Sequence, residues 1–150
     1  MKFEKIIEFH SYDKFGEILY ILHKNNRKYL NDALSKHDLN LLQAMCILTL
    51  DEKSDLSQQD LTDILFLTKS GITKAVKKLE AMGYVERTKS KTDARQHVLN
   101  LTDKGREIIP TLRNINDEWE SRMGLPELDD SFIKILHNLA YKSIDLNSKE

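Results

Sequence analysis

The sequence of 150 residues is poor in the residues that interrupt or cross-link a chain. It has five glycines, two prolines and one cysteine, which favours long helices and excludes an internal disulfide framework. A lone thiol fits a reducing compartment, so we expect a cytoplasmic protein. No apolar run reaches the length of a membrane span, and residues 1–5 carry charge without an apolar signal core. We therefore expect neither membrane insertion nor secretion.

The composition is that of one helix-rich globular domain. Hydrophobic residues make up 40% and charged residues 31% of the chain, which is ordinary for a soluble protein. At this length a single domain, residues 1–150, buries a sufficient core without metal or disulfides.

The net charge of −1 conceals an uneven distribution. Between Thr68 and Arg106 there are ten basic and four acidic residues, a local charge of +6 that leaves −7 for the rest. A basic block within an acidic chain is typical of a nucleic-acid contact surface. The alternative is a solvated lysine-rich face.

Hydrophobic periodicity predicts the helices of the first half. Residues 11–34 form an amphipathic helix, and Asn40 caps a buried one. Ser57 begins a short helix in which Leu61, Ile64 and Leu65 face the core. A break at 67–68 leads to a helix over 69–82, which ends at Gly83.

The second half predicts a β-hairpin followed by helices. Residues 84–88 and 96–101 are rich in β-formers and flank a charged loop. Thr102 caps a helix whose apolar spacing continues to Met123. Pro126 ends that helix, and a last helix covers residues 128–146.

The helix over 69–82 has two unlike faces. Its apolar side holds Ile72, Val76 and Leu79. Its other side holds hydroxyls and amines, namely Ser70, Thr73, Lys74 and Lys77. Such a helix suits the DNA major groove, where these groups bond phosphates and base edges. The alternative is an ordinary amphipathic surface helix.

The hairpin loop concentrates positive charge at a protruding tip. An arginine there, Arg95, can enter the minor groove, and Asp93 can orient its guanidinium. A charged, solvated turn is the alternative. The candidate DNA contacts are Thr68, Lys69, Ser70, Thr73, Lys74, Lys77, Lys89, Lys91, Asp93 and Arg95.

Three stretches resemble the MarR family of transcription regulators. Residues 93–105 resemble its wing signature, D-x-R followed by a strand and L-T-x-x-G. Residues 79–87 resemble its exit from the recognition helix, and 39–43 the start of its second helix. The chain departs from the family at Phe66, because the family's turn usually holds a small or polar residue.

The resemblance implies a fold and a function. The fold is mainly α (α+β), a winged helix-turn-helix with six helices and a two-stranded β-wing. The DNA-binding lobe covers about 38–102, and helices at about 11–34 and 103–146 form a homodimer. The function is that of a ligand-responsive repressor that binds double-stranded DNA at a palindromic operator. A protein-interaction module and a sequence-tolerant architectural DNA-binding protein remain alternatives.

An aromatic acid is the effector that the resemblance implies. Four residues of the first helix suit a ring and a carboxylate: Tyr20, His23, Arg27 and Tyr29. The alternative is that these four residues belong to the dimer interface or to the solvent-exposed surface. Peroxide sensing is not expected, because Cys46 lies in an apolar run as a core thiol. The five histidines are scattered and no catalytic or phosphate-binding motif occurs, so we expect no metal, no cofactor and no enzyme activity.

Overall fold

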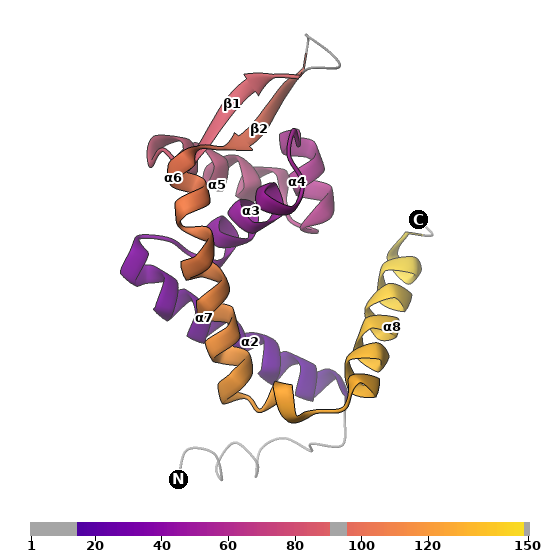
Figure 1. Ribbon diagram of the computed structural model, residues 1–150. Coiled ribbons are helices and arrows are strands. Elements are labelled where there is room, and N and C mark those ends of the chain that lie inside the picture. The colour runs from indigo at the N-terminus through magenta and orange to yellow at the C-terminus, as the bar shows by residue number, and fades with distance from the viewer. Residues whose placement is uncertain (1–14, 91–95, 149–150) are drawn as a thin grey trace. The chain divides into compact units, whose positions relative to one another are not determined.

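A computed structural model describes residues 15–90 and 96–148, which divide into two compact units, Met1–Asn116 and Asp117–Glu150. The first unit begins with helix α2, Phe15–Leu34, and a 3₁₀ turn (Figure 1). Its remaining elements are α3 (Leu41–Glu52), α4 (Gln58–Ile64), α5 (Lys69–Ala81), β1 (Val85–Lys89), β2 (His97–Leu101) and α6 (Asp103–Glu107). Helix α7, Ile109–Arg122, crosses the boundary, and α8, Asp130–Asn147, lies in the second unit.

The fold class agrees with the sequence prediction. Counting α6 and α7 as one interrupted helix, the described residues form six helices and a two-stranded antiparallel sheet. Of the described helices, none combines the length and apolar character needed to cross a bilayer.

Side-chain caps set the starts of several helices, among them α3, α4 and α6. Asn40 accepts a hydrogen bond from the amide of Gln43, and the Gln43 side chain accepts one from the amide of Asn40. Ser57 and Asp60 form the same reciprocal box, and the hydroxyl and the amide of Ser57, which both donate to the Asp60 carboxylate, lower its pKa. Thr102 caps α6 and also donates its hydroxyl proton to the carbonyl of Gly83, at 2.6 Å. Each cap satisfies amides that the helix itself leaves unpaired.

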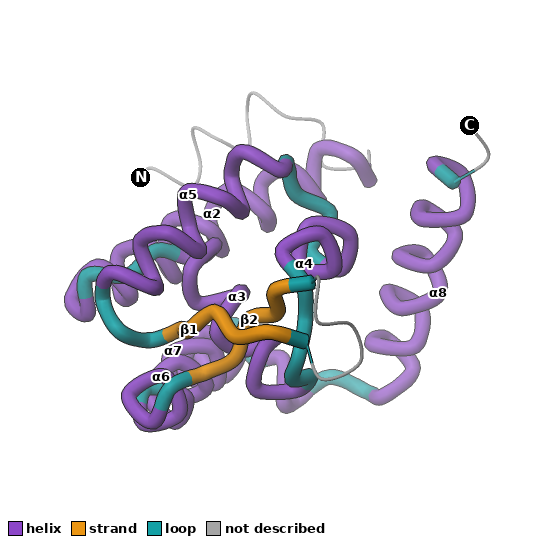
Figure 2. The backbone as a smooth tube through the Cα atoms, turned by 90° about the horizontal axis from the view of Figure 1, so that it is seen from above, coloured by secondary structure: helices purple, strands orange, loops and turns teal. Residues whose placement is uncertain are grey.

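The core of the first unit lies between α3, α4, α5 and the hairpin. Helix α3 packs against α5 and β2, while α4 packs against α5 (Figure 2). The largest fully buried side chains come from all of these elements: Cys46, Ile47, Leu61, Ile72, Val76, Leu79 and Leu99. Burial of these apolar side chains is the main force that fixes α5 to the lobe.

The hairpin is fixed to the helical lobe at its base. Val85 pairs with Leu101 and Lys89 with His97 across the two strands. The amide of Leu99 donates to the carbonyl of Leu56, at 2.7 Å, in an additional antiparallel bridge. The base of the hairpin is therefore hydrogen-bonded to the helical lobe, and the hairpin projects from the lobe beside α5 (Figure 1).

Two sequence predictions about this unit are wrong. The single helix expected over 103–123 is interrupted at Ile108, between α6 and α7. Pro110 lacks the amide proton that a continuous helix would donate to the carbonyl of Arg106. Ile64 was expected in the core, but it lies at the end of α4 and is 42% exposed.

The second unit consists of the end of α7, a 3₁₀ turn at Leu125–Glu127 and α8. Gly124 has a φ of 72°, a left-handed conformation that glycine adopts easily, and Pro126 follows it. The last helix begins at Asp130, after the cap Asp129, two residues later than expected. None of its described side chains is buried.

Candidate nucleic-acid interface

Helix α5 has the two faces that the sequence predicted. The hydroxyl oxygen of Thr68 caps it by accepting from the amide of Gly71, at 3.2 Å. Ile72, Val76 and Leu79 are buried. The opposite face holds the exposed side chains of Ser70, Thr73, Lys74 and Lys77. Since the apolar face is anchored in the core, the polar face is held in a fixed orientation toward solvent.

The positive charge of this surface comes from lysines. Lys69, Lys74, Lys77 and Lys89 are exposed, and none forms an ion pair with another residue that the structure describes. By contrast, Arg87 pairs with Glu80 at 3.1 Å. The guanidinium of Arg87 is therefore already paired within the lobe.

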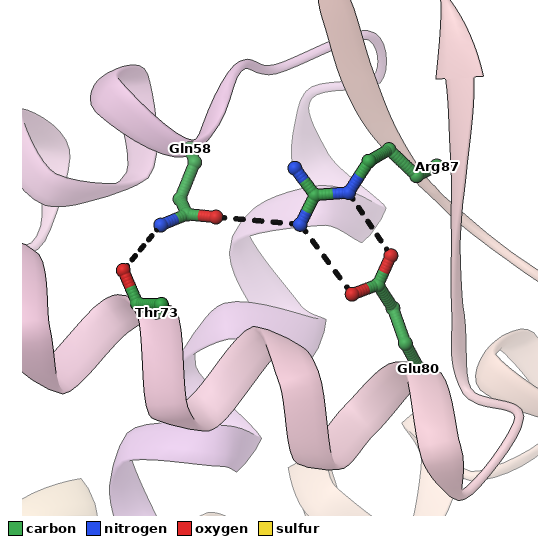
Figure 3. A network of polar contacts seen from close by, with 4 residues as sticks. All are labelled: Gln58, Thr73, Glu80 and Arg87. Atoms are coloured by element: carbon green, nitrogen blue, oxygen red, sulfur yellow. Dashed lines mark hydrogen bonds and ion pairs between the residues drawn. The ribbon is translucent and has the colours of Figure 1, made fainter.

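A polar network joins α4, α5 and β1 (Figure 3). The side-chain amide nitrogen of Gln58 donates to the hydroxyl of Thr73, at 2.6 Å. The amide oxygen of Gln58 accepts from Arg87, at 3.3 Å. Arg87 also donates to both carboxylate oxygens of Glu80, at 3.1 and 3.4 Å. The network connects the base of the hairpin to the exposed face of α5.

The structure places the predicted contact residues in two groups. Those from Thr68 to Lys77 lie on α5 or at its cap, and Lys89 ends β1. Lys91, Asp93 and Arg95 lie outside the described residues. Sequence reasoning missed Gln58 and Arg87. Gln58 bonds to Thr73 and Arg87, which lie 15 and 29 residues further along the chain, so no local spacing reveals this link.

Comparison with known proteins identifies the family. The sequence model described as "MarR family" matches residues 37–96. The transcriptional regulator SarZ of Staphylococcus haemolyticus is 35% identical over 101 residues, which cover 67% of this chain and 69% of SarZ. The chain belongs to the MarR family. BilQ of Clostridioides difficile, another HTH-type transcriptional regulator, is 24% identical over 128 residues, covering 85% of this chain and 86% of BilQ.

Solved structures of MarR proteins share the fold. A crystal structure of MarR matches with a TM-score of 0.80 and 22% identity, covering 94% of this chain and 98% of that one. CouR from Rhodococcus jostii, bound to p-coumaroyl-CoA, gives 0.79 at 21% identity, covering 85% and 90%. The MepR–DNA complex from Staphylococcus aureus gives 0.74 at 17% identity, covering 88% and 97%. Membership of the MarR family makes this chain a transcriptional regulator and not an enzyme.

The four effector candidates of this MarR protein do not share one face of α2. At 100° per residue, Tyr20, His23 and Arg27 lie within one sector, and Tyr29 lies on the opposite side from Tyr20. Tyr20 is 60% exposed, and the centre of its ring lies 5.7 Å from the ammonium nitrogen of Lys24. A single ligand would contact Tyr29 together with the other three only if it reached around the helix.

The thiol of Cys46 lies in the core of the lobe. Its side chain is fully buried, and burial raises the pKa of the thiol to about 11. Because the thiolate is the reactive form, this environment suppresses oxidation and metal binding by Cys46. Among the described residues, no three metal-ligating side chains gather into a possible metal site.

Proposed function

We propose that this MarR-family protein is a homodimeric, site-specific DNA-binding regulator that inserts α5 into the major groove of a palindromic operator. The observation that carries the proposal is the composition of α5. One face is buried in the core, and the other presents hydroxyls and exposed lysines on a rigid support. Such a surface provides phosphate contacts for affinity and polar groups for base edges. Since the ligand is DNA, the proposal includes a cytoplasmic location.

A DNA complex of the same fold supports this choice. MepR of Staphylococcus aureus has been solved with DNA, and its chain superimposes on this one with a TM-score of 0.74. At 17% identity the likeness extends to the fold alone. The specific contacts proposed here therefore rest on the residues of this chain.

Exposed apolar stripes support the homodimer. On α2 the stripe comprises Phe15, Ile18, Leu19 and Leu22, with exposed fractions between 38% and 56%. On α8 it comprises Phe132, Ile135, Leu136 and Leu139, between 40% and 58% exposed. Their spacing by three and four residues places each set on one side of its helix. Apolar surfaces of this kind mark sites of association, and a second copy offers the matching stripes.

The wing completes the proposed contact with DNA. Lys89 is exposed at the end of β1, where the hairpin projects from the lobe. On sequence grounds we place Arg95 in the minor groove, with Asp93 orienting its guanidinium and Lys91 adding positive charge at the tip. Arg95→Ala should weaken binding most for duplexes with A·T-rich flanks, where the groove is narrow and negative. Equal loss for A·T-rich and G·C-rich flanks would contradict minor-groove insertion by Arg95.

Ligand control is part of the proposal. CouR, which shares the fold, was solved with p-coumaroyl-CoA, whose acyl group carries a phenol ring. In this chain the exposed sector of α2 with Tyr20, His23 and Arg27 offers aromatic and cationic groups to an aromatic acid. We propose that such an effector releases the protein from its operator, which would make the protein a repressor.

Selection of bound duplexes from a random DNA pool tests the proposal. The expected result is one imperfect palindrome with half-sites about 10 bp apart or a multiple of that. Retention of DNA without sequence enrichment would favour the architectural DNA-binding protein. Absence of DNA binding at low salt would favour the protein-interaction module. A single asymmetric half-site would contradict binding as a two-fold dimer.

A further inference from the structure

In the network around Thr73, the groups that donate and the groups that accept hydrogen bonds are fixed, starting from the carboxylate of Glu80 (Figure 3). The carboxylate of Glu80 accepts two hydrogen bonds from Arg87. Of the two nitrogens that make these bonds, the terminal Nη2 also donates to the side-chain oxygen of Gln58, at 3.3 Å. A guanidinium can only donate hydrogen bonds. The amide of Gln58 must therefore turn its oxygen toward Arg87 and its nitrogen toward α5.

The orientation of Gln58 determines what the hydroxyl of Thr73 can do. A hydroxyl has one proton and two lone pairs. One lone pair accepts from the amide nitrogen of Gln58, at 2.6 Å. The proton is donated to the carbonyl of Lys69, at 2.8 Å. Among the residues that the structure describes, no other group bonds to this hydroxyl, so one lone pair remains for a ligand on the exposed face of α5.

We infer that Thr73 contacts DNA as a hydrogen-bond acceptor, and that Gln58 and Arg87 are positioning residues that hold it in this state. The inference rests on the proposed function, in which α5 enters the major groove. There the donors are the amino groups of adenine and cytosine, whereas guanine and thymine present acceptors. Each half-site should therefore have a position at which an adenine or cytosine amino group faces Thr73.

The role of Gln58 is to stabilise the hydroxyl in this orientation. Its donated bond polarises the hydroxyl and so strengthens the bond from Thr73 to the carbonyl of Lys69. Without Gln58, that bond is weaker and a second lone pair is open. The proton of Thr73 can then turn toward a base carbonyl more easily, and discrimination between amino and keto bases falls.

The test measures discrimination between paired duplexes. A consensus duplex is first selected with the full-length protein. Each base pair of one half-site is then exchanged so that, on one strand, an amino base (adenine or cytosine) becomes a keto base (guanine or thymine). At one position we expect the exchange to weaken binding roughly five-fold or more. Thr73→Val, which has the same shape without a hydroxyl, should bring the ratio at that position close to one. Thr73→Ser, which keeps the hydroxyl, should retain most of the preference.

The positioning role of Gln58 needs its own variant. Gln58→Met keeps the length of the side chain and removes the donor, so the amino-over-keto ratio at the Thr73 position should fall at least two-fold. Affinity for non-specific DNA and the melting temperature should stay close to those of the native protein. An equal loss for specific and non-specific duplexes would overturn the positioning role of Gln58.

Two further outcomes separate this inference from the proposed function. If Thr73→Val discriminates like the native protein at every base pair, the inference is wrong, and the site-specific regulator remains. If the native protein binds DNA without sequence preference, the proposed function and the inference fail together.

Discussion

Gly105 packs so closely against the backbone carbonyl of Tyr84 that a β carbon at position 105 would overlap the carbonyl oxygen. Thr102, which caps the same helix, bonds to the neighbouring carbonyl of Gly83. The start of α6 is thus packed and hydrogen-bonded against the turn that follows α5. This contact accounts for the glycine in the Leu-Thr-x-x-Gly stretch that leads out of the wing.

Gly105→Ala should therefore destabilise the protein, because the new methyl group meets backbone that cannot move aside. We expect a loss of roughly 2–3 kcal/mol in the free energy of unfolding. Gly16→Ala is the matched control, since nothing lies within 4 Å of a β carbon at that position of α2. Urea unfolding measures both variants. Equal stability of the two alanine variants would show that the contact at Gly105 is not tight.

Phe66 is the second position where backbone geometry predicts a stability change. It has a φ of 51°, a left-handed conformation that is unusual for an aromatic residue, and its side chain is 72% exposed. Phe66→Gly should raise the free energy of unfolding by about 0.5–1 kcal/mol, because relief of the strain exceeds the added freedom of the unfolded chain. Phe66→Ala keeps the β carbon and should give no such gain. If both variants raise the melting temperature equally, the gain comes from removal of the exposed ring and not from relief of backbone strain.

The caps and the amphipathic faces were predictable from the sequence, since both depend on residues close in the chain. Asn40, Ser57 and Thr102 cap the helices that follow them as expected. The buried and exposed faces of α5 follow directly from its periodicity. Gly83 ends the helix region with a φ of 76°, also as expected.

The failures of prediction have physical reasons. The apolar spacing continues through Pro110, so periodicity alone concealed the interruption of the helix at Ile108. Ile64 fits the helical pattern, but α4 ends there before another element covers it. The bond between Gln58 and Arg87 spans 29 residues of sequence. It depends on the packing of the hairpin against α5, which no local pattern specifies.

Cys46 predicts a pH dependence of stability. Burial raises the pKa of its thiol from 9.0 to about 11. Between these values the unfolded chain releases the proton and the folded protein keeps it, so stability should fall as pH rises from 9 to 11. Below pH 9 both states hold the proton, and the thiol adds no pH dependence.

Unfolding measured across this pH range, with Cys46→Ala as the control, isolates the thiol from the other groups that titrate there. The variant should show a smaller fall in stability than the native protein. Thiol reagents at pH 8 should modify the native protein far more slowly than the unfolded chain. Rapid labelling of the folded protein would contradict the core position of Cys46.

The apolar stripe of α8 predicts the effect of charge on association. Leu139→Glu places a carboxylate in the stripe that we assign to the dimer and should shift the protein toward the monomer at micromolar concentration. Tyr141→Glu is the control, because Tyr141 is 62% exposed and lies outside the stripe. Sedimentation equilibrium gives the mass of each variant. If the two variants have the same mass in solution, this stripe is not the dimer contact.

The measurement that tests the exposed face of α5 most directly is the salt dependence of DNA affinity for the native protein and Lys74→Ala. Lys74 is exposed on that face and has no ion-pair partner among the described residues. If it contacts a phosphate, its removal should weaken binding and lower the slope of log affinity against log salt by about one unit. Lys24→Ala, on α2, is the control and should leave both quantities unchanged. An affinity and a salt slope for Lys74→Ala equal to those of the native protein would contradict DNA binding through α5.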